Sequence, residues 1–234
     1  MAVHTKHPAS DPPSAPVREK TGHLLLRGWC ILVLFMALSG TAWVHAFGNL
    51  VAAIITIGGG VLSVVLWITI RPTLQWRRLP WYAVGYVAWA TASLIWSAWP
   101  QATALTLLLL WITTIQGLFI GVVLTWRELV RAIASALKWV MALSILFELW
   151  VSIFIKAPLL PGFVVGTADD PIEYWSRNNL FEGGRIQGIM GNANLLGPVA
   201  LLAIIVFAIR FAARAPRRGL LVAVLTVIPF IGWG

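Results

Sequence analysis

Charge is scarce in this chain of 234 residues: Lys, Arg, Asp and Glu make up 11% of it, whereas hydrophobic residues make up 59%. Two long stretches, residues 28–70 and 79–126, contain none of these four charged residues. Because a soluble domain carries its charged residues on its surface, this composition argues against an ordinary soluble fold. Each stretch is long enough for two membrane-spanning helices of about 20 residues with a turn between them.

Cysteine and acidic residues are also few. Cys30 is the single cysteine, so it forms no disulfide within the chain and has no partner spaced for zinc, and we interpret it as a packing or lipid-facing residue. Eight acidic residues against 17 basic ones give a net charge of +9. Nucleic-acid-binding proteins gather such charge on a soluble face, whereas here it lies at the ends of apolar segments. We therefore expect a lipid bilayer and no nucleic acid as partner.

Seven apolar segments follow one another and predict an all-α, polytopic transmembrane bundle of about seven spans. Short breaks separate them, among them residues 45–49 and residues 99–101, where Pro100 removes a backbone donor and restricts its predecessor. The predicted spans cover approximately residues 28–46, 50–70, 80–99, 104–125, 132–155, 194–213 and 219–234.

This pattern divides the chain into four regions. Residues 1–24 are rich in proline, serine, histidine and charge, which is typical of a disordered tail; a cleaved signal peptide is the alternative. Residues 25–155 hold five predicted transmembrane helices, and residues 156–193 form a loop. Residues 194–234 hold a sixth helix and an incomplete seventh.

The basic residues alternate between the two sides of the predicted membrane. Fourteen of the 17 lie in the tail, around the breaks after the second and fourth spans, and after the sixth span. The other three, Lys156, Arg177 and Arg185, lie in loop 156–193. Basic loops stay in the cytoplasm, so we predict a multi-pass protein of the cell membrane with a cytoplasmic N-terminus and an extracytoplasmic loop 156–193.

Residues 183–194 read Gly-Gly-Arg-Ile-Gln-Gly-Ile-Met-Gly-Asn-Ala-Asn, a polar island between apolar segments. Glycine lets a ligand approach the backbone, and the Arg185 guanidinium suits phosphate or carboxylate. Asparagine caps helices, while Pro198 favours the first helical turn, with Gly197 as an alternative cap. A helix N-terminus beside Arg185 is an anion site. The alternative is a solvated Arg185 paired with Glu182, with Asn194 acting only as a cap.

The segment Arg185-Ile-Gln-Gly188-Ile-Met-Gly191-Asn192-Ala-Asn194-Leu-Leu-Gly197 resembles the signature that opens the conserved region of the O-antigen ligase and O-antigen polymerase family. The series of spans before an extracytoplasmic loop is also similar to that family. The resemblance implies a membrane glycosyltransferase that moves or polymerises oligosaccharide from an undecaprenyl-pyrophosphate carrier. The acceptor would be a glycan or glycolipid outside the cytoplasmic membrane, and no nucleotide sugar, metal or other cofactor is needed.

By this resemblance Arg185 would bind the carrier's pyrophosphate and stabilise the leaving charge as the catalytic residue. Gln187, Asn192 and Asn194 would bind the substrate. Family members have about a dozen spans, each of about 20 residues, and a later outer loop whose histidine activates the acceptor. The final apolar segment here has 16 residues and no polar flank, so we expect a fragment of that fold. We interpret His45 as an interfacial residue and not as the missing base.

Glu148 lies inside the fifth predicted span, about two turns from its outer end at about 1.5 Å per residue. An ionisable group at such depth is a functional candidate, so Glu148 joins the candidate substrate-binding residues. It could line an acceptor cavity, act as a base or pair with Lys156 or Arg185, and we favour pairing. Asp169 and Asp170 could bind a divalent cation, but adjacent loop acids are usually solvated, and we assign no metal site.

Two other functions compete with glycan transfer. Broken helices and intramembrane charges are typical of transporters, so a polytopic transporter or flippase of envelope lipids is one alternative. Within the predicted spans only Lys138, Glu148 and Arg210 are charged, which disfavours ion coupling. A non-catalytic membrane scaffold is the other alternative.

Overall fold

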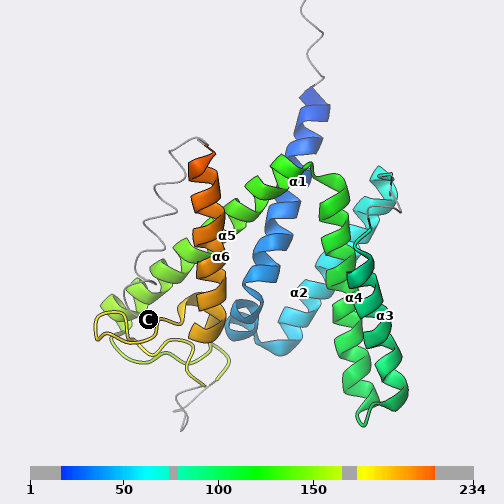
Figure 1. Cartoon of the computed structure of the whole chain (residues 1–234). Coiled ribbons are helices and arrows are strands. Elements are labelled where there is room, and N and C mark those ends of the chain that lie inside the picture. The colour runs from blue at the N-terminus through cyan, green and yellow to red at the C-terminus, as the bar shows by residue number, and fades with distance from the viewer. Residues whose placement is uncertain (1–16, 74–78, 165–172, 214–234) are drawn as a thin grey trace, which may run out of the picture.

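The computed structural model describes residues 17–73, 79–164 and 173–213, which form six α-helices joined by short turns and one long loop (Figure 1). Five of the helices are long and apolar enough to cross a membrane. The predicted all-α membrane bundle is thereby confirmed. The helices are α1 (Val17–Leu38), α2 (Gly40–Ile70), α3 (Trp81–Ala92), α4 (Pro100–Val123), α5 (Trp126–Trp150) and α6 (Ala193–Ala212).

The segment expected as the third span, residues 80–99, divides into α3 and a 3₁₀ turn, Ser93–Trp96. The Thr91 hydroxyl donates to the Val87 carbonyl at 2.7 Å, and Ser93 bonds back in the same way. Such bonds compete with regular helix formation. With 12 residues, α3 is shorter than the roughly 20 residues of a span. Among its described residues, region 25–155 therefore holds four helices long and apolar enough to span a membrane, where five were expected. In Figure 1, α3 nevertheless runs between the same two ends of the bundle as α4. The expected seventh segment lies outside the described residues.

The turn between the first two helices lies at Ser39, whereas we expected it at residues 45–49. The Ser39 hydroxyl donates to the Phe35 carbonyl at 2.6 Å, which satisfies a carbonyl at the end of α1. Gly48 lies within α2, where its φ of 83° and ψ of 166° kink the helix. Glycine adopts such a conformation because it has no Cβ.

α1 and α5 are among the helices that begin earlier than expected. α1 starts at Val17, inside the region assigned to the tail, and α5 starts at Trp126. At the start of α5 the Glu128 carboxylate accepts from the Thr125 backbone N–H at 3.0 Å and from the Thr125 hydroxyl at 2.7 Å. An acidic residue in the first turn also favours this helix end through the helix dipole.

Two apolar clusters hold the helices together, and α5 belongs to both. One cluster joins α5 and α6 to the loop before α6, and it includes Leu137, Met141, Ile186, Met190, Leu196 and Phe207. The other joins α1, α4 and α5, and it includes Cys30, Val33, Phe119, Ile120 and Ala132. The packing role expected for Cys30 is confirmed, since its side chain is fully buried. Ile186 and Met190 are core residues, and they anchor the polar segment 183–194 in the bundle.

Arginines lie at both ends of the bundle. In Figure 1 the start of α1, the end of α2, the α4–α5 junction and the end of α6 lie at one end, and the loop between α5 and α6 lies at the other. Arg71 caps α2, Arg127 lies in the first turn of α5 and Arg210 in the last turn of α6. Arg177 and Arg185 belong to the opposite end. The described helix ends with Arg71, Arg127 and Arg210 thus share one end of the bundle, and the side of the membrane that each end faces stays a prediction.

Candidate functional site

The loop between α5 and α6 is tied together by an isolated antiparallel bridge between Leu159 and Ser176. The Leu159 N–H donates to the Ser176 carbonyl at 2.8 Å, and the Ser176 N–H donates to the Leu159 carbonyl at 3.2 Å. The bridge holds the segment that contains Arg177 against the chain leaving α5. This geometry brings Arg177 to the residues that precede α6.

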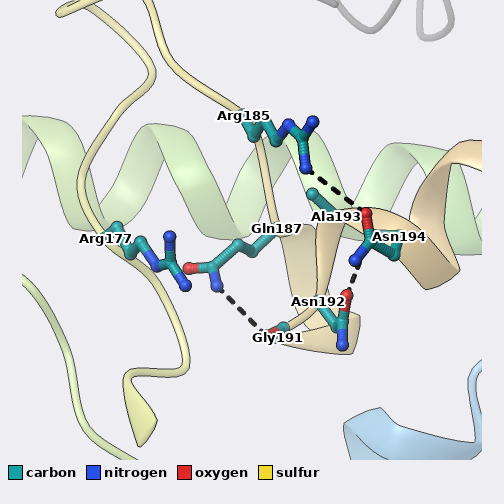
Figure 2. A pocket seen from close by; sticks show the side chains of 7 residues that line it. All are labelled: Arg177, Arg185, Gln187, Gly191, Asn192, Ala193 and Asn194. Carbon is teal, nitrogen blue, oxygen red and sulfur yellow. Dashed lines mark hydrogen bonds between the residues drawn. The ribbon is translucent and has the colours of Figure 1, made fainter. Parts of the chain in front are cut away.

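A pocket of about 170 Å³ lies at this end of the bundle (Figure 2). Four of the five candidate residues line it, and the described lining residues include two arginines and no carboxylate. The pocket is therefore positively charged and suits an anion. Asp169 and Asp170, considered above as cation ligands, lie outside the described residues. The lining residues are Arg177, Arg185, Gln187, Gly191, Asn192, Ala193 and Asn194.

The N-terminus of α6 forms one wall of the pocket. Asn192, and not Asn194, is the N-cap: its Oδ1 accepts from the Asn194 N–H at 2.9 Å. The Asn192 carbonyl accepts from the N–H groups of Leu195 and Leu196, both at 3.1 Å. Three of the first four helical N–H groups are therefore bonded within the described chain. The helix start offers a ligand the Ala193 N–H and the positive dipole end, which is less than we expected.

Pro198 lies in the second turn of α6 and not in the first, because the helix starts at Ala193. Lacking an N–H, Pro198 cannot donate to the carbonyl of Asn194 four residues before it. Gly197 is a helix residue as well, so it does not serve as the cap.

Arg185 is exposed at the mouth of the pocket. Its Nη1 donates to Asn194 Oδ1 at 3.5 Å, which is a long hydrogen bond. Within the described residues no ion pair joins it to Glu182, so the simple surface pairing considered above does not form. Asn194 instead directs the guanidinium over the start of α6 (Figure 2).

Gln187 and Arg177 form the opposite wall. Gln187 is 5% exposed, and its Nε2 donates to the Gly191 carbonyl at 3.2 Å, while its Oε1 is buried without a hydrogen-bond partner. In Figure 2 the Gln187 carboxamide and the Arg177 guanidinium point toward one another. Sequence reasoning used Arg177 only to orient the loop. The sequence did indicate that Arg177 is one of only three basic residues in loop 156–193, which could have suggested a role beside Arg185.

Glu148 does not line the pocket but lies beneath it, 2% exposed. Its Oε1 accepts from the backbone N–H of Gln187 at 3.1 Å and of Gly188 at 2.7 Å, and its Oε2 accepts from the Ser176 hydroxyl at 2.8 Å. Among the described residues it forms no ion pair with Lys156 or Arg185. A buried carboxylate is tolerated only with such donors. Glu148 therefore anchors the loop to α5, and the substrate-contacting position that we expected for it is not observed.

The glycines of the motif allow the loop to approach other helices closely. Gly188 has a φ of 57°, and a Cβ there would lie 2.6 Å from the Ser144 Cβ on α5. Gly191 has a φ of 65°, and a Cβ there would lie 2.7 Å from His45 Nε2 on α2. Both conformations favour glycine. The close neighbours of these glycines are protein side chains, whereas the approach of a ligand to the backbone stays a prediction.

His45 packs against the motif, which its sequence position did not indicate. Its Nδ1 lies 2.8 Å from the Thr41 carbonyl, so Nδ1 carries the proton in this contact. The ring stacks on Trp175 at 6.1 Å between centroids. The Trp175 indole N–H in turn donates to the Ile189 carbonyl at 2.8 Å. These contacts connect the kinked start of α2 to the site.

Comparison of the chain with protein-family models, curated proteins and solved structures finds no match. The pocket is therefore characterised by its own chemistry. Two guanidiniums, a capped helix start and a buried carboxamide meet at one end of an apolar helical bundle.

Proposed function

We propose that this protein acts in the transfer of envelope glycans, moving or polymerising an oligosaccharide from a polyprenyl-pyrophosphate carrier to an acceptor glycan or glycolipid. The observation that carries the proposal is the pairing of Arg177 and Arg185 in one pocket without a lining carboxylate. Guanidiniums bind phosphate oxygens through paired N–H donors. Two of them, next to a helix N-terminus, suit a diphosphate.

The position of the pocket supports a lipid-linked ligand. Helices α5 and α6, which flank the pocket, are both apolar enough to span a membrane. A polyprenyl chain would lie among lipid tails while its diphosphate stays at the end of the bundle. The basic residues at the opposite end favour a cytoplasmic location for that end, which would place the pocket on the outer side, where envelope glycans are assembled.

The proposed reaction is a substitution at the first sugar of the donor. The acceptor hydroxyl oxygen attacks the anomeric carbon, the bond from that carbon to the diphosphate oxygen breaks, and the hydroxyl proton passes to solvent water. The diphosphate leaves with the bonding electron pair and gains negative charge. Arg185 and Arg177 would stabilise that charge, and losing one such donor lowers a rate by about 10²- to 10³-fold.

Asn192 and Asn194 would act through the shape of the site. Asn192 caps α6 through its bond to the Asn194 N–H, and Asn194 Oδ1 directs the Arg185 guanidinium. An arginine fixed in this way loses less freedom when it binds an anion. Gln187 supports the far wall through its bond to the Gly191 carbonyl.

The role of Glu148 bears on the competing transport function. Ion-coupled transporters use intramembrane acids that exchange a proton or cation. Glu148 instead accepts three hydrogen bonds from the loop. We therefore favour glycan transfer over a transporter or flippase.

The Arg185→Ala variant, expressed from the native gene in its host, tests the proposal. We expect transferred surface glycan to fall about 100-fold or more, because a donor to the leaving group is lost. Arg131→Ala is the matched control, since Arg131 is an exposed arginine near the start of α5 and outside the pocket. Gel analysis of surface glycan with immunoblotting of the protein measures both. Wild-type glycan at normal protein level would contradict the proposal.

A second experiment distinguishes transfer from a scaffold. A polyprenyl diphosphate that carries a photoreactive group close to its phosphates should crosslink to residues 185–194 in the wild-type protein. Excess pyrophosphate should compete with the crosslink. A scaffold without a carrier site would give no competed crosslink.

A further inference from the structure

One buried carboxylate supports both arginine-bearing segments of the pocket. Glu148 Oε1 accepts from the N–H groups of Gln187 and Gly188, just after Arg185. Glu148 Oε2 accepts from the Ser176 hydroxyl, just before Arg177. The two segments are therefore tied to the same side chain of α5 from two directions.

Ser176 holds Arg177 through the backbone on both sides. Its fully buried hydroxyl donates to Glu148 Oε2 at 2.8 Å and accepts from the Asn178 N–H at 3.2 Å. Its own backbone forms the bridge to Leu159. Arg177 lies in the middle of this turn, so the position of its Cα follows from the bond between Ser176 and Glu148.

We propose that the Glu148–Ser176 pair sets the separation of the Arg177 and Arg185 guanidiniums, and that this separation makes the pocket selective for two linked phosphates over one. The proposal rests on the proposed function, since both require an anion in the pocket. Two guanidiniums whose backbone segments are held in place bind both phosphates of one ligand at a lower ordering cost. A single phosphate needs only one guanidinium, so it gains little from their separation.

The Ser176→Ala variant isolates the Arg177 segment. It removes the hydrogen bond to Glu148 Oε2 and the acceptor of the Asn178 N–H. It keeps both backbone hydrogen bonds from the Arg185 segment to Glu148 Oε1. Ser176 is thus a positioning residue for Arg177. Loss of the Ser176 hydroxyl should weaken the binding of pyrophosphate, which needs both arginines, and leave the binding of phosphate, which needs one, nearly unchanged.

The experiment measures inorganic phosphate and pyrophosphate binding to the purified full chain in lipid nanodiscs by calorimetry at one fixed ionic strength. We expect the wild-type protein to bind pyrophosphate about 10-fold more tightly than phosphate, because charge-assisted bonds to a second guanidinium are added. Ser176→Ala and Arg177→Ala should each remove this preference and change phosphate affinity by less than about 2-fold. The double variant Ser176→Ala/Arg177→Ala should lose no more pyrophosphate affinity than either single variant, because the effects of coupled residues are not additive.

Two further variants complete the test. Ser152→Ala is the matched control and should keep the wild-type preference. Ser152 is a buried serine in the π-helical turn Val151–Ile155 that follows α5, its hydroxyl has no hydrogen-bond partner among the described residues, and it does not line the pocket. Glu148→Gln should also keep it, since the amide oxygen can accept from Gln187 and Gly188 while its nitrogen donates to the Ser176 oxygen. Glu148→Gln therefore tests the geometry even where Ser176→Ala fails to fold.

Each outcome decides for or against the inference. An unchanged preference in Ser176→Ala, an equal loss for both anions, or an additive double variant overturns it. Loss of the preference in a folded Glu148→Gln protein also overturns it, because charge and not geometry would then be responsible. Wild-type protein that binds neither anion contradicts the proposed function itself, whereas wild-type preference with an unaffected Ser176→Ala variant contradicts only the positioning role.

Discussion

Gly188 is the position in the site where backbone conformation and packing together most strongly disfavour a side chain. Its φ is 57°, a Cβ would lie 2.6 Å from Ser144 Cβ and 3.0 Å from Leu196 Cδ2, and its N–H donates to Glu148. An L-residue in this conformation costs about 1–2 kcal/mol before any clash. The position therefore needs glycine for structural reasons.

We expect Gly188→Ala to lower the free energy of unfolding by about 2 kcal/mol or more, because strain and overpacking add to each other. The melting temperature of the purified protein in detergent measures the effect. Gly197→Ala is the matched control, since a Cβ there meets no atom within 4 Å inside α6 and alanine favours a helix. Equal melting temperatures for the two variants would show that the close approach of Gly188 to α5 is absent.

At the residue scale, the sequence predicted the part of the site that is contiguous. Arg185, Gln187, Asn192 and Asn194 line one pocket because they lie within ten positions and lead into a helix. Arg177 joins them only through the bridge between Leu159 and Ser176. Such an isolated bridge produces no periodic pattern in the sequence, so sequence reasoning had no means of pairing the two arginines.

At the element scale, hydrophobic length predicted the long helices well and their turns less well. Pro100 marked a boundary correctly, and α4 begins with it, as is common for proline in a first turn. The break at Ser39 was missed, because we took the glycine at position 48 as the turn signal, whereas Gly48 only kinks α2. A serine hydroxyl that bonds back to its own helix leaves little mark on hydropathy.

The contact between α2 and α4 gives a prediction about element packing. A Cβ at Gly60 would collide with the Ile112 side chain on α4, whereas a Cβ at Gly58 meets no atom within 4 Å. We expect Gly60→Leu to destabilise the bundle by about 1–3 kcal/mol, because extra methylene groups force the helices apart. The same substitution at Gly58 should be tolerated. Thermal unfolding in detergent compares them, and a Gly58→Leu protein that is as unstable as Gly60→Leu would contradict this packing.

At the scale of the whole molecule, the unequal distribution of basic residues among the loops predicts its orientation. Cys30 is fully buried, so an introduced cysteine can be detected against a silent background. We expect a membrane-impermeant maleimide to label Glu182→Cys in intact cells and to label Arg131→Cys only after permeabilisation. Both residues are exposed, Glu182 in the loop between α5 and α6 and Arg131 near the start of α5, and these two regions lie at opposite ends of the bundle in Figure 1. Labelling of Arg131→Cys in intact cells would show that the bundle is inverted.

The anchoring of Glu148 has a consequence for how the protein is made. When α5 enters the membrane, the donors to Glu148 Oε1 have not yet been synthesised, since they lie 39 and 40 residues further along the chain. An ionisable side chain within a membrane-spanning segment is costly without partners, and that cost persists until the chain has been extended past Gly188. During this interval Glu148 on α5 lacks the backbone donors of Gln187 and Gly188. Completion of the loop before α6 would supply these donors, so the segment that forms the pocket also completes the assembly of the bundle.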